Sequence, residues 1–156
     1  MPLWGRRMTT VAYKDGIMAS DSLITDGSAR VGHVRKIGYV NGWLYGFAGG
    51  LASCQMIEQW IKEGADPEQR PNRRMSKGTQ LLMVHESAPK SILMFDDGEA
   101  TRFETNQISI GTGSEYAVGA MLHGAGAKEA VKLAAKVDTK TGGKIISRSF
   151  KKGVDA

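Results

Sequence analysis

Two adjacent threonines, Thr9 and Thr10, open a strand-like pattern near the start of this 156-residue sequence. If residues 1–8 were removed, Thr9 would carry both a nucleophilic hydroxyl and a free α-amine. Such an amine titrates at about 7.7 to 8.0, close to neutral pH, so it can take the proton of the hydroxyl. Thr9 would then be a nucleophile that supplies its own general base, which suits it to cleaving an amide bond.

The elements that must position Thr9 begin with two short strand pairs. Asp15-Gly16 and Asn41-Gly42 are both typical of a two-residue type I′ turn, because Asp, Asn and Gly tolerate positive φ. The strands expected on either side of these turns cover residues 10–13, 17–21, 34–40 and 43–47. The first part of the chain is therefore predicted to be an antiparallel meander.

A helix is expected next, because Leu51 to Lys62 carries apolar residues at helical spacing and Gly64 and Pro67 end the pattern. Residues 65–78 show no pattern and are expected to form an exposed loop. Further strands are expected at 80–85, 91–95, 100–104, 108–110 and 144–150, with a turn at 96–98 and helices at 114–123 and 127–136. This order predicts an α+β fold in which two sheets carry helices on their outer faces.

Length and composition indicate a single domain with one substantial core, since 41% of the residues are hydrophobic. No apolar run approaches the ~20 residues of a membrane span, so a cytoplasmic protein without a membrane partner is expected. The lone Cys54 excludes an internal disulfide and is interpreted as a small packed helix residue. No His and Cys cluster has metal-ligand spacing, so neither a metal ion nor a cofactor is expected.

The net charge of +5 is concentrated in residues 128–152, which contain eight Lys or Arg and two acids. Four lysines recur there every four residues and would form one basic stripe on a helix: Lys128, Lys132, Lys136 and Lys140. A solvated face is the simplest interpretation. An acidic partner or nucleic acid is the alternative, and nucleic acid is disfavoured because the stripe lacks interleaved aromatic residues.

Six short motifs follow one another along the chain. They are Thr9-Thr10, Ala19-Ser20-Asp21, Arg35-Lys36-Ile37, Gly46-Phe47-Ala48-Gly49-Gly50, Ile110-Gly111-Thr112-Gly113-Ser114 with Tyr116-Ala117, and Asp138-Thr139-Lys140-Thr141-Gly142-Gly143. Their order and spacing resemble those of catalytic proteasome β subunits and of the bacterial HslV peptidase, which are N-terminal-nucleophile (Ntn) hydrolases. The resemblance implies a four-layer αββα sandwich of two antiparallel sheets. Residues 9–156 would form one Ntn-hydrolase domain, and residues 1–8 a leader or tag removed on maturation.

The resemblance also implies a role for each polar residue. Thr9 is the implied nucleophile, Lys36 places a positive charge beside it, and Asp21 pairs with Lys36 and orients it. The backbone N–H of Gly49 is implied to form the oxyanion hole. Asp138 and Thr141 are implied to support the N-terminal amine, and Thr112 is implied to belong to the same catalytic site. Thr112 stands where the family usually has serine, and Asp138 alone would equally suit a helix end or turn.

The same alignment predicts the pocket for the residue before the scissile bond. Ile24, Val34, Phe47 and Leu51 fall where family members line that pocket. The pocket is expected to be hydrophobic and shallow, because Leu51 stands where smaller residues are common. Cleavage after Leu or Tyr is therefore expected over cleavage after Arg or Glu.

The sequence departs from the family pattern in three places. Only the loop at 65–78 stands where the family carries a second long helix, so the first helical layer is expected to be thin. A thin layer puts the docking of an ATPase unfoldase in question. The chain also ends soon after one strand. Met8 precedes Thr9 where self-processing members have glycine, which favours simple removal of an initiator methionine. A homo-oligomeric ring acting on polypeptide substrates is implied by the resemblance.

The leading hypothesis is a threonine endopeptidase of the proteasome and HslV kind. One alternative keeps the nucleophile and changes the substrate to a small-molecule amide. The other is a catalytically silent, proteasome-like ring scaffold whose Thr9 stays capped by residues 1–8. Lys36 and Asp21 argue against the scaffold, since it has no reason to bury that pair.

Overall fold

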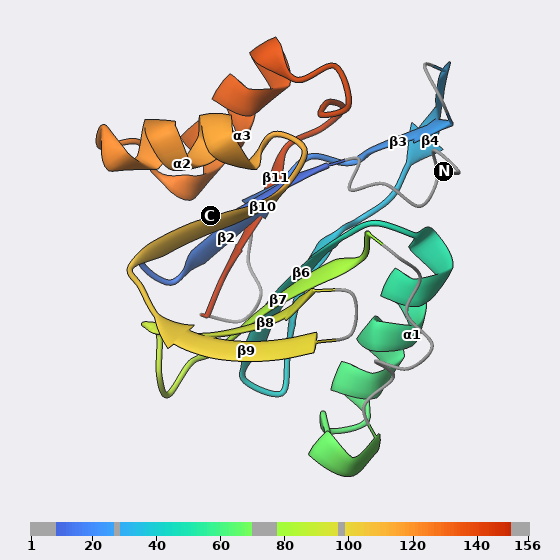
Figure 1. Ribbon diagram of the computed structural model, residues 1–156, viewed down its shortest axis with the longest axis vertical. Helices are drawn as coiled ribbons and strands as arrows, with labels where there is room; N and C mark the ends of the chain where they lie inside the picture. Colours follow the sequence, from blue (N-terminus) through green and yellow to red (C-terminus); the bar gives the residue numbers. More distant parts are fainter. Residues whose placement is uncertain (1–8, 27–28, 70–77, 97–98, 151–156) are drawn as a thin grey trace.

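Two antiparallel sheets lie face to face in the computed structural model, which describes residues 9–26, 29–69, 78–96 and 99–150 (Figure 1). The first sheet contains, in spatial order, β10 (Gln107–Gly111), β1 (Thr10–Lys14), β2 (Ile17–Ser20) and β11 (Ile146–Ser149). The second contains β5 (Ile37–Val40), β6 (Trp43–Ala48), β7 (Gln80–His85), β8 (Ser91–Asp96) and β9 (Glu99–Glu104). A separate ribbon pairs β3 (Leu23–Asp26) with β4 (Ala29–His33).

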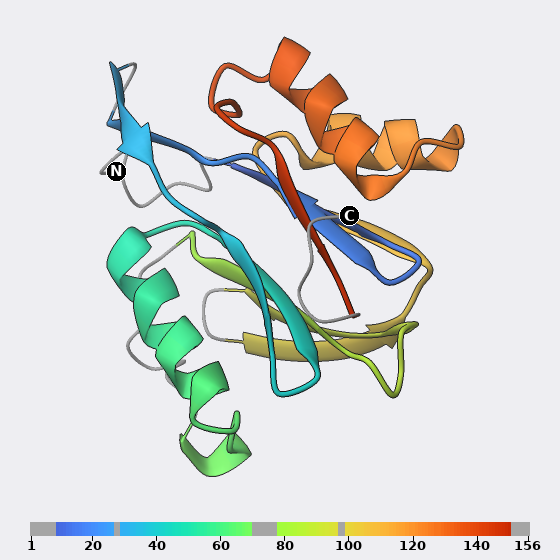
Figure 2. The ribbon, with the colours of Figure 1, turned by 180° about the vertical axis from the view of Figure 1, so that it is seen from behind.

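Helices cover the outer face of each sheet (Figures 1 and 2). The helices α2 (Ser114–Leu122) and α3 (Ala127–Val137) lie on the first sheet, and α1 (Leu51–Lys62) lies on the second. A 3₁₀ turn at Pro67–Gln69 follows α1, which is the only α-helix on its sheet within the described residues. The expected αββα sandwich with a thin first helical layer is confirmed. None of the described helices is long and apolar enough to cross a membrane.

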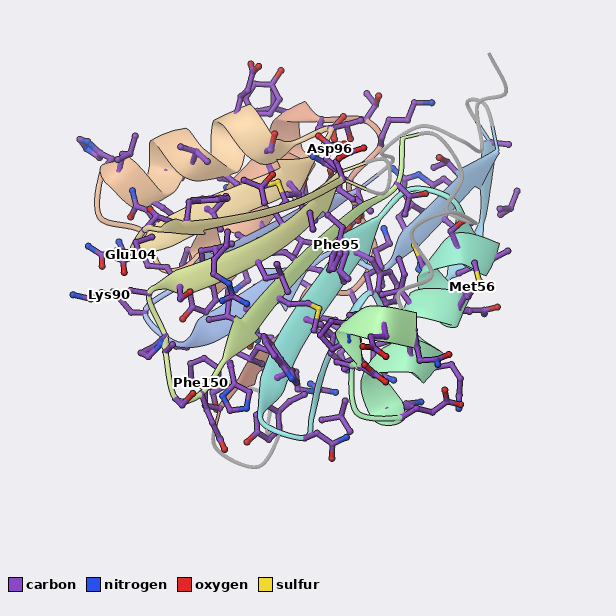
Figure 3. The ribbon with its side chains drawn as sticks, turned by 60° about the horizontal axis from the view of Figure 1, so that its bottom comes forward. Met56, Lys90, Phe95, Asp96, Glu104 and Phe150 are labelled. Atoms are coloured by element: carbon purple, nitrogen blue, oxygen red, sulfur yellow. The ribbon has the colours of Figure 1, made fainter. Side chains whose placement is uncertain are left out.

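The alternation of side chains along the strands explains the central layers. Leu82 of β7 packs between the two sheets, whereas its neighbour Leu81 packs toward α1. Successive residues of a strand point to opposite faces, so a strand covered on both sides must be apolar throughout. Phe95 of β8 also lies on the α1 side (Figure 3). Its ring meets that of Trp60 edge-on.

Small residues fill the third apolar layer, between the first sheet and its helices. Six buried alanines share this layer: Ala12, Ala19, Ala117, Ala127, Ala130 and Ala134. Their short side chains let α2 and α3 pack close to the sheet. As a result, the segment that follows α3 is held beside the start of β1.

Both predicted type I′ turns are confirmed. Asp15 and Gly16 have φ of 50° and 83°, and Asn41 and Gly42 have φ of 53° and 82°. Positive φ at both central positions matches the twist of the flanking strands. The first of these turns sets the pairing of β1 with β2.

Three expectations differ from the structure. The ribbon β3–β4 was not expected, and the strand expected from residue 34 begins at Ile37, because the Val34 N–H donates to the Ser22 carbonyl at 2.8 Å. The helix α3 ends at Val137, so Lys140 lies beyond the helix that was to carry the basic stripe. The expected leader at 1–8, residues 70–77 of the expected loop, and residues 97–98 of the expected turn lie outside the described residues.

Candidate active site

The pairing of β1 with β2 brings Thr9 to Asp21. The two strands run antiparallel with Val11 opposite Ser20, so the residue before β1 and the residue after β2 meet. The Asp21 N–H donates to the Thr10 carbonyl at 3.3 Å, which extends the ladder to this end of the hairpin. The two side chains that the sequence places twelve residues apart therefore share one site.

Lys36 completes a buried polar group around the Thr9 hydroxyl. Its Nζ donates to Thr9 Oγ1 at 2.5 Å and to Asp21 Oδ1 at 3.0 Å. It also donates to the Leu23 carbonyl at 2.7 Å, which gives its three N–H bonds three acceptors. Thr9 Oγ1 donates in turn to Asp21 Oδ1. The structure thus places the proposed nucleophile, the lysine and the aspartate in direct contact.

The environment of Lys36 decides its electrostatic effect. Lys36 is 6% exposed and Asp21 is fully buried. Burial lowers the pKa of the Lys36 ammonium, and the neighbouring Asp21 carboxylate acts in the opposite direction. A desolvated cation that touches Thr9 Oγ1 favours loss of the hydroxyl proton, because it stabilises the oxyanion that forms.

Backbone donors orient the Asp21 carboxylate. Oδ1 accepts from the Thr10 N–H at 3.2 Å, and Oδ2 accepts from the Gly142 N–H at 2.9 Å. Hydrogen bonds from two chain segments, at both oxygens, hold the carboxylate in one orientation. Through Asp21, Lys36 is therefore positioned by β1 and by the segment after α3 together.

A second group of hydroxyls surrounds Asp138, the C-cap residue that follows α3. Asp138 Oδ2 accepts from Thr112 Oγ1 and from Thr141 Oγ1, each at 2.6 Å. Its Oδ1 accepts from the Lys140 N–H at 3.1 Å, so the same carboxylate also serves the turn that was the alternative interpretation. Thr112 Oγ1 lies 3.4 Å from the Thr9 carbonyl oxygen, which places this group beside the Thr9 main chain.

Thr10 joins this second group, although the sequence reasoning assigned it no role. Its Oγ1 lies 2.8 Å from Thr141 Oγ1, and because Thr141 donates to Asp138, the Thr10 hydroxyl is the donor. Consecutive side chains of a strand point to opposite faces. The signal that could have revealed Thr10 is therefore this alternation, which sends Thr9 toward Lys36 and Thr10 toward Thr141.

Gly49 lies between the end of β6 and the start of α1, at the rim of an apolar cavity that Thr9 also lines. Its φ is 128°, and a Cβ there would lie 2.5 Å from Thr79 Cα. The Gly50 N–H next to it donates to Thr79 Oγ1 at 3.4 Å. This residue must be glycine on both backbone and steric grounds, and Thr79, which no pattern predicted, holds the junction.

Replacing Gly49 with alanine is expected to lower the free energy of unfolding by about 1 to 3 kcal/mol, because the new side chain is strained and meets backbone. Urea denaturation measures the loss. Gly119→Ala in α2 is the matched control, since a Cβ there meets nothing within 4 Å. That control should keep or slightly raise stability. Equal stability of the two variants would contradict the conclusion that position 49 requires glycine.

The four residues predicted for the specificity pocket come together around the cavity. The cavity has a volume of about 50 Å³, and its lining includes Ile24, Val34, Phe47 and Leu51 together with Thr9 and Lys36. Cys54 also lines the cavity and is 2% exposed. Burial raises the pKa of the Cys54 thiol to about 12, so the thiol is a neutral wall at ordinary pH.

Solved structures share this architecture. The chain is similar to BPH from Thiobacillus denitrificans in complex with epoxomicin, with a TM-score of 0.65 and 20% identity over 89% of this chain and 95% of that chain. It is also similar to eukaryotic HslV from Trypanosoma brucei, with a TM-score of 0.63 and 17% identity over 90% of this chain and 97% of that chain. The chain has the HslV-type fold. No protein-family model and no curated protein sequence matches it, so the likeness lies in the fold.

Within this HslV-type fold, every residue predicted for the site lies in one of three neighbouring groups. The nucleophile group is Thr9, Asp21 and Lys36, and the hydroxyl group is Thr112, Asp138 and Thr141. The pocket residues and Gly49 line the cavity. The three groups meet at Thr9. Its hydroxyl contacts Lys36 and Asp21, its carbonyl lies beside Thr112 of the hydroxyl group, and the residue itself lines the cavity.

Proposed function

We propose that the protein is a threonine endopeptidase that acts after residues 1–8 are removed and Thr9 becomes the N-terminus. The observation that carries the proposal is the 2.5 Å contact between Lys36 Nζ and Thr9 Oγ1, inside a buried polar group that borders an apolar cavity. Packing alone does not require a buried ammonium that donates to a threonine hydroxyl. Such an ammonium is what activation of that hydroxyl requires.

In the proposed reaction, Thr9 Oγ1 attacks the carbonyl carbon of the scissile amide while the freed α-amine of Thr9 takes the hydroxyl proton. The Gly49 N–H donates to the oxyanion of the tetrahedral intermediate, a contact typically worth about 2.7 to 4 kcal/mol in the transition state. The proton passes to the leaving amine as the C–N bond breaks, which leaves an ester on Thr9. Water then hydrolyses the ester and restores the hydroxyl.

The group around Asp138 supports the α-amine in this proposal. Thr112 lies beside the Thr9 carbonyl, and Thr112, Thr141 and Thr10 form one connected set of hydroxyls through Asp138 Oδ2. An acceptor group at this point can orient the amine and exchange its proton. The conformation of the Thr9 main chain is thereby held while its side chain reacts.

The cavity supports a preference for apolar residues before the scissile bond, since a charged side chain there would be buried without a partner. Leu51→Ala is expected to deepen the pocket and to raise the kcat/KM ratio for Tyr over Ala peptides by about 10-fold. Fluorogenic peptides that differ only at this residue measure the ratio. Leu51 is 40% exposed, and the matched control is Leu133→Ala on α3, where the side chain is 42% exposed. An equal change in both variants would contradict the assignment.

We further propose that identical subunits form a closed ring that encloses the polypeptide substrate. The similarity in fold to HslV supports this part of the proposal, and native mass measurement tests it. A cytoplasmic location and an ATPase unfoldase partner stay predictions. The single helix on the second sheet, within the described residues, offers such a partner less helical surface than a two-helix layer would.

Peptide hydrolysis by two preparations tests the proposed activity. A chain that begins at Thr9 should cleave apolar fluorogenic peptides, and the same chain with residues 1–8 attached should not, because its Thr9 nitrogen is an amide. Activity toward small amides without peptides would favour the small-molecule alternative. Absence of hydrolysis in both preparations would favour the scaffold.

A further inference from the structure

A second hollow lies beside the apolar cavity, and Val34 borders both. It opens where the edge strand of the first sheet, β11, runs next to β5, the edge strand of the second (Figure 2). The polar residues that line it are Ser22, His33, Arg35, Lys144 and Arg148. No described residue in this lining is acidic, so the hollow has a positive electrostatic character.

A buried hydroxyl without a partner lies in the wall of this hollow. Ser22 is 7% exposed, and its Oγ makes no hydrogen bond to any of the described residues. Buried polar atoms are nearly always hydrogen-bonded, since leaving one unpaired is unfavourable. An unpaired hydroxyl that lines a cationic hollow indicates a bound ligand whose acceptor atom would receive its hydrogen bond.

Gly143 lies against Ser22 and His33 in the same part of the hollow. A Cβ on Gly143 would lie 2.7 Å from Ser22 Oγ and 2.8 Å from His33 Nδ1. The hydroxyl and the imidazole therefore both lie close to Gly143, and the side chain of any larger residue would collide with them. Both groups can donate a hydrogen bond to one oxygen atom that packs against Gly143 within reach of both.

We propose that this hollow binds a small, multiply charged oxyanion such as a phosphate or a polycarboxylate. Ser22 Oγ and His33 Nδ1 donate to one oxygen of the anion, and Lys144 and Arg148 surround its charge. Arg35 adds charge at the rim while it keeps its 3.4 Å ion pair with Glu58. The site contains none of the residues assigned to catalysis, so it stands whether or not the protein is a peptidase.

A bound anion would join two segments that the fold already holds together, the one at Ser22 and the one that follows α3. The Ser22 and Leu23 N–H groups both donate to the Gly142 carbonyl at 3.1 Å. An anion between Ser22 on one segment and Lys144 on the other bridges the same junction. A ligand that binds only the folded chain stabilises it in proportion to its concentration, so binding should raise the melting temperature in a saturable way.

Thermal melting of the chain with increasing phosphate, at constant ionic strength, tests the proposal, with citrate as a second arm. Wild type should show a saturable rise in melting temperature with at least one of the two. Ser22→Ala and Lys144→Glu should each weaken the apparent affinity by about 10-fold or more. Lys136→Glu, an equal charge change at an exposed residue of α3, should leave the apparent affinity unchanged.

The anion-free measurement separates loss of the site from loss of the fold. Ser22→Ala removes an unpaired buried hydroxyl, so without anion it should melt at or above the wild-type temperature. A response to phosphate alone would assign the site to phosphate compounds, and a response to citrate alone to polycarboxylates. No saturable response in wild type, or an unchanged affinity in Ser22→Ala, would overturn the proposal.

Discussion

Replacing Thr9 with alanine, in a chain that begins at residue 9, is expected to reduce kcat/KM for peptide cleavage by about 10⁴-fold or more. The side chain lost is the proposed nucleophile, and knocking out a nucleophile removes nearly all covalent catalysis. The residual rate would come only from the pocket and the Gly49 N–H. Steady-state hydrolysis of an apolar fluorogenic peptide, followed over hours, measures the difference.

Thr9→Ser is the matched control for this result, because it keeps the hydroxyl that contacts Lys36 and Asp21. It should retain far more activity than Thr9→Ala while melting at a similar temperature. Circular dichroism of both variants reports whether the fold survives the change. Cleavage by folded Thr9→Ala at the wild-type rate would show that Thr9 is not the nucleophile.

Replacing Asp21 with alanine is expected to lower the free energy of unfolding by about 3 to 5 kcal/mol, because it leaves the buried Lys36 ammonium without its anion. Lys36→Met should be less damaging, since Asp21 keeps the N–H groups of Thr10 and Gly142. The double variant should be more stable than the sum of the two losses predicts. Both single variants should lose peptidase activity.

The pH dependence of Asp21→Ala gives an independent check. Burial lowers the pKa of Lys36 in the folded chain below its unfolded value of about 10.4, and losing Asp21 removes the group that opposes this shift. Between the folded and the unfolded pKa, the unfolded chain binds more protons, so stability rises with pH in that window. Urea denaturation across a series of pH values should show a rise that begins at lower pH in Asp21→Ala than in wild type.

An exposed ion pair supplies the control for the double-variant cycle. Lys132 and Glu129 lie 3.4 Å apart on α3 with most of Glu129 exposed. Solvent screens such a pair, so their cycle should show almost no coupling. Similar coupling for both pairs would mean that Lys36 and Asp21 are not held together as a buried pair.

The sequence predicted the hairpins and the layers because local chemistry dictates them. Asp15-Gly16 and Asn41-Gly42 allow only a narrow set of turns, and both form as expected. Helical spacing located α1 to the residue, since Leu51–Lys62 is the observed helix. The apolar character of β7 follows from its burial on both faces.

Features that depend on long-range register could not be read from the sequence. Thr79 reaches Gly49 only because β6 pairs with β7 so that Ala48 lies opposite Gln80. The β3–β4 ribbon contains a shift in register between Ile24 and Thr25, which breaks the simple alternation that would have revealed it. No local pattern carries either pairing.

The candidate site likewise combines features that local sequence predicts with features that depend on long-range packing. The motifs indicated which side chains belong to it, but their partners follow from the packing of separate segments. The Gly142 N–H reaches Asp21 across 121 positions of the chain, and Thr141 meets Thr10 across 131. The orphan hydroxyl of Ser22 is likewise visible only once Gly143 is placed against it.

The most direct test of the central claim is the intact mass of protein made from its natural gene, measured before and after treatment with an epoxyketone and combined with N-terminal sequencing. An epoxyketone needs both a threonine Oγ and a free amine on the same residue. We predict a chain that begins at Thr9 and gains one adduct on that residue. A chain that keeps residues 1–8 and stays unlabelled would contradict the account and leave the fold serving as a scaffold.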